Sequence, residues 1–396
     1  MRRIRDLQSS HNRRNRLSKK VQEIEPSGIR KFFDLIIGRK DIISLGVGEP
    51  DFPVPWKIRE EMIYALEKGY TSYTSNYGLY DLREAVAKYY KKFGVKSEPD
   101  NIIITTGVSE AIDLALRATI NEGDSVLIPD PSYVSYKPLT ILAGGNPILI
   151  PTLPDFKLNY EKISKYAKIT SPKILIINYP ANPTGISYRK KELEEIADAV
   201  IEYDLLVISD EIYAELTYSF NHVSIASLNG MEDRCIVMNG FSKAFAMTGL
   251  RVGYVIAPPD ITSAMLKIHQ YSMLCAPIVS QIGALEALKN AEDDLERMKA
   301  KYMRRRNFFV KKLRNFFDVL KPDGAFYVFP DIRNTRLSSE EFAEKLLMKK
   351  SVAVVPGNAF GECGEGHIRC SYAVSMDKLK EAINRIESFL KELNLI

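Results

Sequence analysis

Short apolar runs alternate with amphipathic stretches between about residues 100 and 260. The apolar runs are rich in β-branched residues and read NIIITTG, SVLIPD, ILIINYP, LLVISDE and CIVMNGFS. The stretches between them, such as SEAIDLALRATI and KKELEEIADAVIEY, carry apolar residues at helical spacing. Near-continuous apolar strands separated by helices are typical of a parallel sheet covered on both faces. We therefore predict an α/β fold whose large domain has a mostly parallel sheet covered by helices.

The C-terminal part of the chain follows a different pattern. A charged, helix-like stretch over about residues 284–316 leads to KPDGAFYVFPDI, to VAVVPGNAFGECGEGHIRCSYAV and to a final amphipathic helix. This order predicts a smaller α+β domain that packs closely on the large one. We expect a basic arm at 1–16, a segment at 17–46 whose helix SGIRKFFDLIIGR packs with the small domain, a large domain at 47–285 and the small domain at 286–396.

Composition places the chain among ordinary globular proteins. Hydrophobic residues make up 45% of the chain and charged residues 27%. There is no apolar run long enough for a membrane span, and the N-terminus lacks the apolar core of a secretory signal. The cysteines are scattered without a CxxC pair, which argues against a disulfide framework or a structural zinc site. We expect a cytoplasmic protein without a metal site.

The net charge of +5 is concentrated at the N-terminus. Residues 1–20 carry eight Arg or Lys and one Asp, a net +7, so the rest of the chain carries −2. A basic arm of this kind can bind nucleic acid, and it also resembles a transit peptide. Most such arms are solvated or rest on an acidic surface, so we do not expect nucleic acid as a partner.

Ligands of parallel sheets bind outside the carboxyl ends of the strands. Each apolar run here ends in polar residues or in Gly and Pro, so we expect the chemistry at that edge. TTGVSEAI (105–112) reads as a strand, a glycine turn and a helix start, with Ser109 at a cap position. The free amides of a helix start suit a phosphate. A capped helix without a ligand is the alternative interpretation.

Two further strand ends offer polar groups of different chemistry. ISDEIY (208–213) places Asp210 and Tyr213 directly after an apolar strand, where the carboxylate could hold a protonated ring nitrogen or cap the next element. NYPANPTG (178–185) presents Asn182 before a proline, in a loop that a glycine turn completes. Taken alone, each motif is compatible with an ordinary loop.

The stretch NGFSKAFAMTGLRVGY (239–254) holds the strongest chemical candidate, Lys243. A lysine that is partly desolvated and close to other cations has a lowered pKa, which favours a neutral amine able to bond to a carbonyl carbon. Arg251 and Ser242 could bind a phosphate. Two solvated cations on a loop are the alternative. Phosphate donors, an acid for a ring nitrogen and a reactive lysine are together what pyridoxal phosphate requires.

Seven motifs occur along the chain in one order: GEPDF, YTSNYGLYDLREAV, NYPANPTG, SDEIY, GFSKAFAMTGLRVGY, PDGAFYVF and IRCSYA. In these motifs the chain, from about residue 17 to its end, resembles the fold-type I pyridoxal-phosphate enzymes of the class I/II aminotransferase family. Microbial aspartate and aromatic aminotransferases are the similar members. The resemblance implies that 47–285 binds pyridoxal 5′-phosphate and that the enzyme transfers amino groups by a ping-pong mechanism.

The resemblance also implies roles for individual residues. Lys243 binds the cofactor covalently and transfers the substrate proton, and Asp210 pairs with the pyridine nitrogen. Arg369 binds the substrate α-carboxylate with help from Gly48 and Asn182. Tyr73 reaches the phosphate of the neighbouring subunit, which implies a homodimer with shared active sites. The other cofactor ligands are Asn182 and Tyr213 at the ring oxygen, Val108, Ser109, Ser242 and Arg251 at the phosphate, and Tyr133 on the ring face.

The substrate is less clearly marked than the reaction. Dicarboxylate-specific relatives use a second arginine after the lysine, whereas MLKIHQYSMLCAP (265–277) offers Lys267, His269 and Gln270. We therefore expect an aromatic or broad-specificity donor, with aspartate still open, and 2-oxoglutarate as acceptor. A β-lyase on the same scaffold is the alternative enzyme. A ligand-sensing regulator is a further alternative, but the residues before the family core are too few for a DNA-binding domain.

Overall fold

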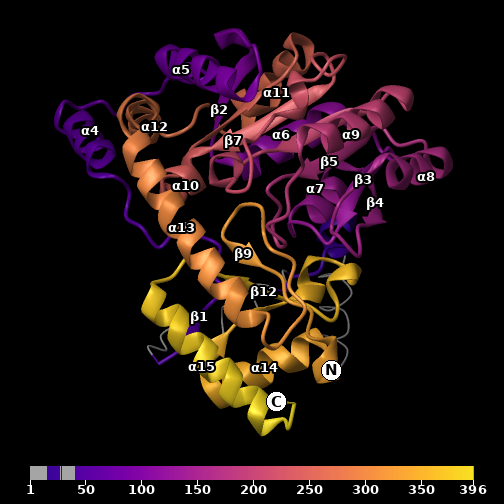
Figure 1. The fold of residues 1–396 in the computed structure, drawn as a ribbon. Coiled ribbons are helices and arrows are strands. Elements are labelled where there is room, and N and C mark those ends of the chain that lie inside the picture. Colours follow the sequence, from indigo (N-terminus) through magenta and orange to yellow (C-terminus); the bar gives the residue numbers. More distant parts are fainter. Residues whose placement is uncertain (1–15, 27, 29–40, 396) are drawn as a thin grey trace, which may run out of the picture.

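A seven-stranded sheet forms the centre of the larger part of the protein (Figure 1), whose computed structural model describes residues 16–26, 28 and 41–395. The strand order is β2-β8-β7-β6-β5-β3-β4. The strands from β3 to β7 pair in parallel, whereas β8 is antiparallel to both of its neighbours. The strands are β2 (Ile102–Thr105), β3 (Ser125–Asp130), β4 (Asn146–Pro151), β5 (Ile174–Asn178), β6 (Leu206–Asp210), β7 (Cys235–Gly240) and β8 (Gly253–Ile256). The predicted, mostly parallel sheet is confirmed.

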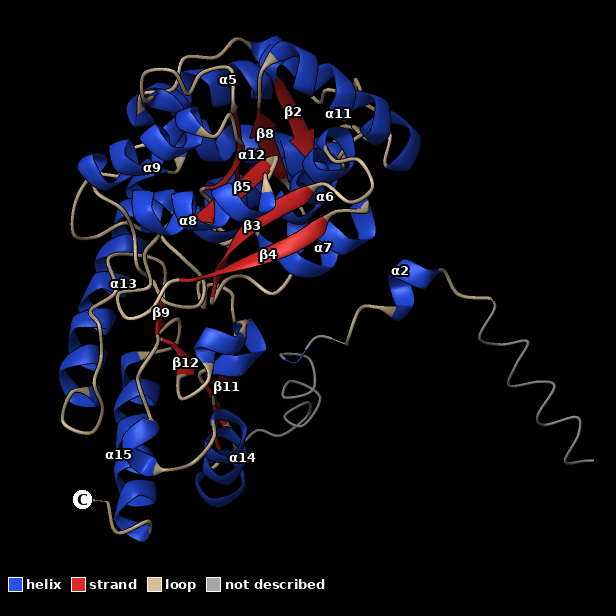
Figure 2. Cartoon of the chain, turned by 90° about the vertical axis from the view of Figure 1, so that its right-hand side faces the viewer, coloured by secondary structure: helices blue, strands red, loops and turns tan. Residues whose placement is uncertain are grey.

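Helices cover both faces of this sheet (Figure 2), because alternate strand residues point to opposite faces and both sets are apolar. In β2, Ile103 packs on one face, and its neighbours Ile102 and Ile104 pack on the other. The face of Ile103 is covered by α6 (Val108–Thr119), α7 (Tyr136–Ala143) and α11 (Pro259–Ser272). The opposite face is covered by α5 (Tyr80–Tyr90), α8 (Tyr160–Thr170) and α9 (Lys190–Glu202).

A smaller α+β part lies below the sheet in Figure 1. It contains the antiparallel sheet β11-β12-β9 and the parallel pair β1-β10. Helices α14 (Ser339–Lys350) and α15 (Met376–Glu392) pack together beside these strands. The strands are β1 (Ile43–Ser44), β9 (Tyr327–Val328), β10 (Val352–Ala353), β11 (Val355–Pro356) and β12 (Ile368–Ser371).

Two helices share the charged stretch at 284–316, with Ala291 between them in a non-helical conformation. The first, α12 (Ile278–Asn290), packs on α4 (Trp56–Glu67) and α5 in the larger part. The second, α13 (Glu292–Leu313), runs from the larger part to the smaller one (Figure 1). The predicted boundary between 285 and 286 lies within α12, and the division into domains stays a prediction.

Apart from Gly28, the predicted helix at 27–39 lies outside the described residues, and so does nearly all of the predicted arm at 1–16. The described N-terminal segment has one short helix, α2 (Lys19–Gln22), which begins after the N-cap Ser18. No helix in the described part of the chain is both long enough and apolar enough to cross a membrane.

Candidate active site

A cavity of about 550 Å³ opens at the carboxyl ends of β5, β6 and β7, where the larger part meets the smaller one. Its wall includes all the site residues predicted from the sequence except Tyr73. Those residues are Gly48, Val108, Ser109, Tyr133, Asn182, Asp210, Tyr213, Ser242, Lys243, Arg251 and Arg369. They come from separate strand ends and loops, so the edge of the sheet gathers them as the strand pattern predicts.

Lys243 lies in the one-turn helix α10 (Phe241–Ala244), directly after β7. Its Nζ donates a hydrogen bond to the carbonyl oxygen of Gly48 at 2.7 Å. Burial is the main cause that lowers the pKa of Lys243 to about 8; the cations Arg369 and Arg251 act in the same direction, whereas Glu49 and Asp210 oppose them. The neutral, nucleophilic fraction of this amine near neutral pH is therefore larger than that of an ordinary lysine.

Asp210 is the last residue of β6 and is almost fully buried. Its Oδ2 accepts a hydrogen bond from the hydroxyl of Tyr136 at 2.7 Å, and its Oδ1 accepts one from the amide of Ile212 at 3.1 Å. Burial raises the pKa of Asp210 to about 6, although the hydrogen bond from Tyr136 acts in the opposite direction. The carboxyl group thus stabilises a local turn and lines the cavity, but it does not cap the next helical element, Ala214–Leu216, whose N-cap is Tyr213.

The start of α6 forms one end of the cavity, and its cap differs from the prediction. Gly107 is the N-cap, and Ser109 is the second residue of the helix, so the predicted cap position of Ser109 is wrong. The reason is steric, because Gly107 has φ 81° and ψ 170°, a conformation that is essentially restricted to glycine. A Cβ on Gly107 would also lie 2.8 Å from Nη2 of Arg251.

No side chain of the described residues caps α6, so the amides of Val108 and Ser109 at the start of this helix can bind an anion. The guanidinium of Arg251 lies against Gly107 and donates to the carbonyl oxygens of Thr248 at 3.0 Å and Thr106 at 3.4 Å. Ser109 and Ser242 also line the cavity. Backbone amides, two hydroxyl groups and a guanidinium together form a donor set suited to a phosphate.

Arg369 lies on β12 of the smaller part and reaches into the cavity from the opposite side. It is 2% exposed, and its Nη1 and Nη2 donate to Oδ1 of Asn182 at 2.9 Å and to the carbonyl oxygen of Gly46 at 2.6 Å. The guanidinium lies over the rings of Tyr327 and Phe360, with its Cζ 4.5 and 4.9 Å from the two centroids. These contacts hold a buried cation ready for a carboxylate.

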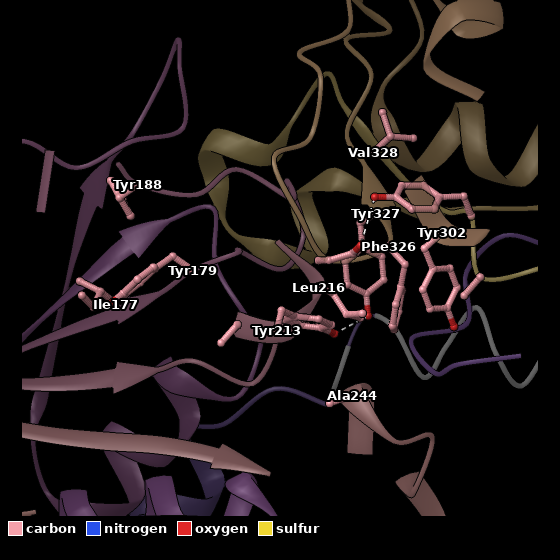
Figure 3. Close-up of a cluster of buried hydrophobic side chains, with 14 of the residues drawn as sticks. Ile177, Tyr179, Tyr188, Tyr213, Leu216, Ala244, Tyr302, Phe326, Tyr327 and Val328 are labelled. Atoms are coloured by element: carbon pink, nitrogen blue, oxygen red, sulfur yellow. Dashed lines mark hydrogen bonds between the residues drawn. The ribbon is translucent and has the colours of Figure 1, made fainter. Parts of the chain in front are cut away.

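Tyrosine rings line the space between Asp210 and Arg369. The hydroxyl groups of Tyr213 and Tyr327 are 2.8 Å apart (Figure 3), and burial raises the pKa of Tyr213 well above its usual value. Its hydroxyl group therefore stays protonated and can donate a hydrogen bond. Tyr327 also contacts Gly48, where a Cβ would lie 2.9 Å from the Tyr327 hydroxyl oxygen. A side chain at position 48 would thus displace a wall of the cavity.

Comparison with known proteins shows the family to which this chain belongs. The family model of aminotransferase class I and II matches residues 40–386. The chain belongs to the class I and II aminotransferases. It is 46% identical to an aspartate aminotransferase of Pyrococcus abyssi, over 96% of this chain and 99% of that protein. It is 45% identical to aromatic-amino-acid aminotransferase 2 of Thermococcus litoralis, over 96% of this chain and all of the other.

Solved structures agree with this assignment. The crystal structure of an aromatic aminotransferase from Pyrococcus horikoshii superposes with a TM-score of 0.88 at 46% identity, and it covers 93% of this chain and all of that one. The protein is therefore a pyridoxal-phosphate-dependent aminotransferase of fold type I. The reaction class, the fold and the cofactor expected from the motifs are confirmed.

The residues that this aminotransferase places around the cavity fit its cofactor. The uncapped start of α6, with Arg251 and two serines beside it, matches a phosphate. Asp210 matches the ring nitrogen, and the amine of Lys243 lies on the same cavity wall for the aldehyde carbon. The donor set, the acceptor and the nucleophile therefore meet in one space, as pyridoxal phosphate requires.

Two tyrosines of the aminotransferase site were not predicted from the sequence. Tyr136 is fully buried and bonds Asp210, although it stands only three positions after the predicted Tyr133 in DPSYVSY. Tyr327 lies within the motif PDGAFYVF, to which the sequence assigns no role. For Tyr136 the only signal is its proximity to Tyr133, because the partner of its hydroxyl group is 74 positions away.

Tyr73, which was predicted as a site residue, and three residues from the segment at 265–277 lie outside the cavity wall. Tyr73 is 83% exposed, and its role at a neighbouring subunit stays a prediction. His269 is fully buried, and its Nδ1 is 2.6 Å from Oε1 of Glu110, so it is not available for a substrate carboxylate. Lys267 is exposed, and neither it nor Gln270 lines the cavity.

Proposed function

We propose that this aminotransferase moves the amino group of aromatic amino acids, or of a broad range of amino acids, to 2-oxoglutarate and acts as a homodimer. The observation that carries the proposal is the convergence of Lys243, Asp210 and Arg369 on one cavity. The first is an amine that is partly neutral, the second a buried carboxyl group and the third a buried guanidinium. These are the groups needed to move a proton at Cα, to bind a cationic ring and to bind a carboxylate.

Arg369 binds the α-carboxylate of each substrate in this proposal. Its Nε is buried without a hydrogen-bond partner among the residues that the structure describes, so the guanidinium has donor capacity left. The neighbouring amide of Asn182 and the backbone at Gly48 complete the carboxylate site. Because β12 belongs to the smaller part, a bound substrate bridges both parts of the protein and helps to exclude water.

Asp210 and the start of α6 hold the two ends of the cofactor. Asp210 pairs with the ring nitrogen, Tyr213 and Asn182 bond the ring oxygen, and Tyr133 covers one ring face. Val108, Ser109, Ser242 and Arg251 bind the phosphate. When bound, the cofactor supplies an electron sink for the charge that develops at Cα.

Lys243 carries the cofactor and then moves the proton. Its side chain enters from α10 toward Gly48, on the carboxylate-binding side of the cavity. Burial and neighbouring cations keep a share of the amine neutral, so its Nζ could take up the proton that leaves Cα and hold it for later return. One base therefore serves both halves of a ping-pong reaction.

The cavity wall supports an apolar or mixed donor. In the part of the chain that the structure describes, the cationic residues of the wall are Lys243, Arg251 and Arg369, and each already has a role. Ile112, Val134 and Ile212 add apolar surface, and among the described residues no further cation lines that wall to bind a distal carboxylate. An aromatic side chain is therefore accepted at less cost than a second carboxylate.

An exposed apolar face supports the homodimer. Asn76 donates to the carbonyl oxygen of Leu274 at 2.8 Å, so the loop around Tyr73 lies beside the end of α11. Large exposed apolar side chains that gather on one part of a surface often mark an interface. The exposed side chains on α4, on the 70–80 segment and near the end of α11 are Trp56, Ile63, Tyr64, Leu66, Tyr70, Tyr73, Tyr80, Tyr271, Met273 and Leu274. A second copy that covers this face would bring its Tyr73 toward the neighbouring site.

The compartment that we propose is the cytoplasm. All four cysteines are free, and two of them, Cys235 and Cys370, are buried. Unpaired thiols persist in a reducing compartment.

The test of the reaction combines the purified enzyme, pyridoxal phosphate, 2-oxoglutarate and a panel of donors that includes tyrosine, phenylalanine and aspartate. We expect glutamate to form in equal amount to the new oxo acid, fastest with an aromatic donor. Release of ammonia without glutamate would instead identify a lyase, and activity with aspartate alone would refute the proposed donor class. Analytical ultracentrifugation tests the dimer, which a monomeric protein at assay concentration would contradict.

A further inference from the structure

We propose that Tyr136 is a positioning residue whose hydroxyl group holds Asp210 as an oriented carboxylate facing the ring nitrogen of the cofactor. The inference rests on the proposed function, because it presumes that Asp210 meets that nitrogen. The inference assigns a role to a residue that contacts neither substrate nor cofactor and acts through Asp210.

The geometry of Tyr136 ties together two parts of the site. Tyr136 is the first residue of α7 and is fully buried, and its hydroxyl group lies 2.7 Å from Oδ2 of Asp210. Its ring meets the ring of Tyr133 edge to face, with centroids 5.5 Å apart and planes at 81°. One side chain therefore bonds the carboxylate and supports the ring that we assign to the cofactor face.

The carboxylate depends on this single side-chain donor. Among the hydrogen bonds of the described residues, the carboxylate of Asp210 accepts one from a side chain, that of Tyr136, and one from a backbone amide, that of Ile212. The two donors bond different oxygens and so restrict rotation of the carboxylate. Losing the hydroxyl group would leave one oxygen without a donor and the group free to turn.

The next residue along the chain shows the contrasting arrangement. Glu211 points to the opposite face of the sheet, where it accepts hydrogen bonds from five side chains. Although burial alone would raise it, the bond from His222 and the hydroxyl donors hold the pKa of Glu211 below its usual value. Tyr90 is one of these donors, at 3.1 Å from Oε2. The pair of Tyr90 and Glu211 is thus a buried tyrosine–carboxylate bond that does not face the cavity.

The sign of the effect on Asp210 follows from its surroundings. The titratable groups that act on it are Tyr136 on α7, Lys243 on α10, Glu211 beside it on the chain and Tyr213. Burial raises the pKa of Asp210 to about 6, and both Tyr136 and Lys243 counteract that rise. Removing the Tyr136 hydroxyl group therefore raises the pKa further. A protonated Asp210 cannot pair with a cationic ring nitrogen, so the cofactor should bind weakly over a wider pH range.

The experiment measures the dissociation constant of pyridoxamine phosphate between about pH 5 and pH 8. This probe carries the same ring and phosphate but no aldehyde, so bonding to Lys243 does not enter. In the wild type we expect affinity to weaken as the pH falls through about 6. In Tyr136→Phe the midpoint should rise by about one pH unit, which corresponds to one charge-assisted hydrogen bond. The phosphate of the probe titrates equally in all variants, so their difference isolates Asp210.

Two further variants separate positioning from a structural role. Tyr90→Phe removes a buried tyrosine–carboxylate bond on the opposite face of the sheet. It should lower the melting temperature at least as much as Tyr136→Phe does, and it should leave the pH midpoint of pyridoxamine phosphate binding unchanged. Site-specific 3-fluorotyrosine at position 136 keeps the ring and is a stronger donor, so it should move the midpoint down, even if Tyr136→Phe folds poorly.

Each outcome bears on a different claim. An unchanged midpoint in both position-136 variants would overturn the role of Tyr136, whatever their melting temperatures. An equal shift in Tyr90→Phe would overturn it as well, because the effect would then be a general loss of packing. A wild-type protein that fails to bind pyridoxamine phosphate would refute the assignment of the site itself.

Discussion

Arg369 offers a quantitative test of substrate binding. The change is Arg369→Ala, which removes a guanidinium that is 2% exposed and held by Asn182, Gly46 and two aromatic rings. Because these contacts fix the side chain before the substrate arrives, little entropy is lost when a carboxylate binds. The amino acid and the oxo acid carry the same carboxylate, so both should lose the same interaction.

The size of the loss follows from the type of bond. A hydrogen bond to a charged group contributes about 1.5–3 kcal/mol, and truncating one partner of a buried charge pair costs about 2–5 kcal/mol. For a bound carboxylate we therefore take about 3 kcal/mol, which is roughly a hundredfold change. Since the carboxylate is bound in both the ground state and the transition state, most of the change should appear in KM and little in kcat.

The assay is steady-state kinetics of Arg369→Ala with several donors and with 2-oxoglutarate. Arg306→Ala is the matched control, because Arg306 is 3% exposed, bonds the carbonyl oxygen of Pro322 at 2.9 Å and lies over the ring of Tyr218. That arginine does not line the cavity, so its loss should lower the melting temperature and leave KM unchanged. A KM that is unaltered in Arg369→Ala, or one that rises equally in the control, would refute the reasoning.

Two further predictions concern the cofactor. When the cofactor-free protein is mixed with pyridoxal phosphate, the rate of covalent binding should rise with pH and level off above about pH 8, because the lowered pKa of Lys243 makes the neutral amine available there. Stopped-flow absorbance measures this rate. A rate that still rises above about pH 10 would indicate a lysine with an ordinary pKa. Gly107→Ala should weaken cofactor binding by roughly 1–3 kcal/mol, since the φ of 81° is strained for alanine and the new Cβ would meet Arg251. The control is Gly123→Ala: Gly123 has φ 86°, and a Cβ there would have no atom within 4 Å, so this change should affect only stability. Equal cofactor affinities in the two variants would argue against a phosphate site at α6.

The location of the site at the carboxyl ends of the strands could be predicted from the sequence, because the pattern that marks those ends is local. Apolar runs that end in polar residues mark the carboxyl ends of strands, and parallel pairing then brings Asp210 and Lys243 to one edge. The same reasoning could not find Tyr136, because its bond to Asp210 depends on how α7 packs on the sheet. It also misplaced the cap of α6, since the backbone at Gly107 adopts a conformation essentially restricted to glycine and takes the N-cap position itself.

Specificity was the part least open to prediction. The residues at 267–270 offered possible cations, but packing turns His269 inward to Glu110 and leaves Lys267 exposed. Which side chain faces the cavity depends on the orientation of α11 against α6, and no local pattern encodes that.

The most direct test of the account is to locate the cofactor on the chain. The protein is loaded with pyridoxal phosphate, reduced with borohydride, digested and analysed by mass spectrometry, with Lys243→Ala and the exposed Lys267→Ala treated in parallel. We predict one stoichiometric adduct on the peptide that contains Lys243, the same adduct in Lys267→Ala and none in Lys243→Ala. A stoichiometric adduct on another lysine, or one that persists in Lys243→Ala, would contradict the account.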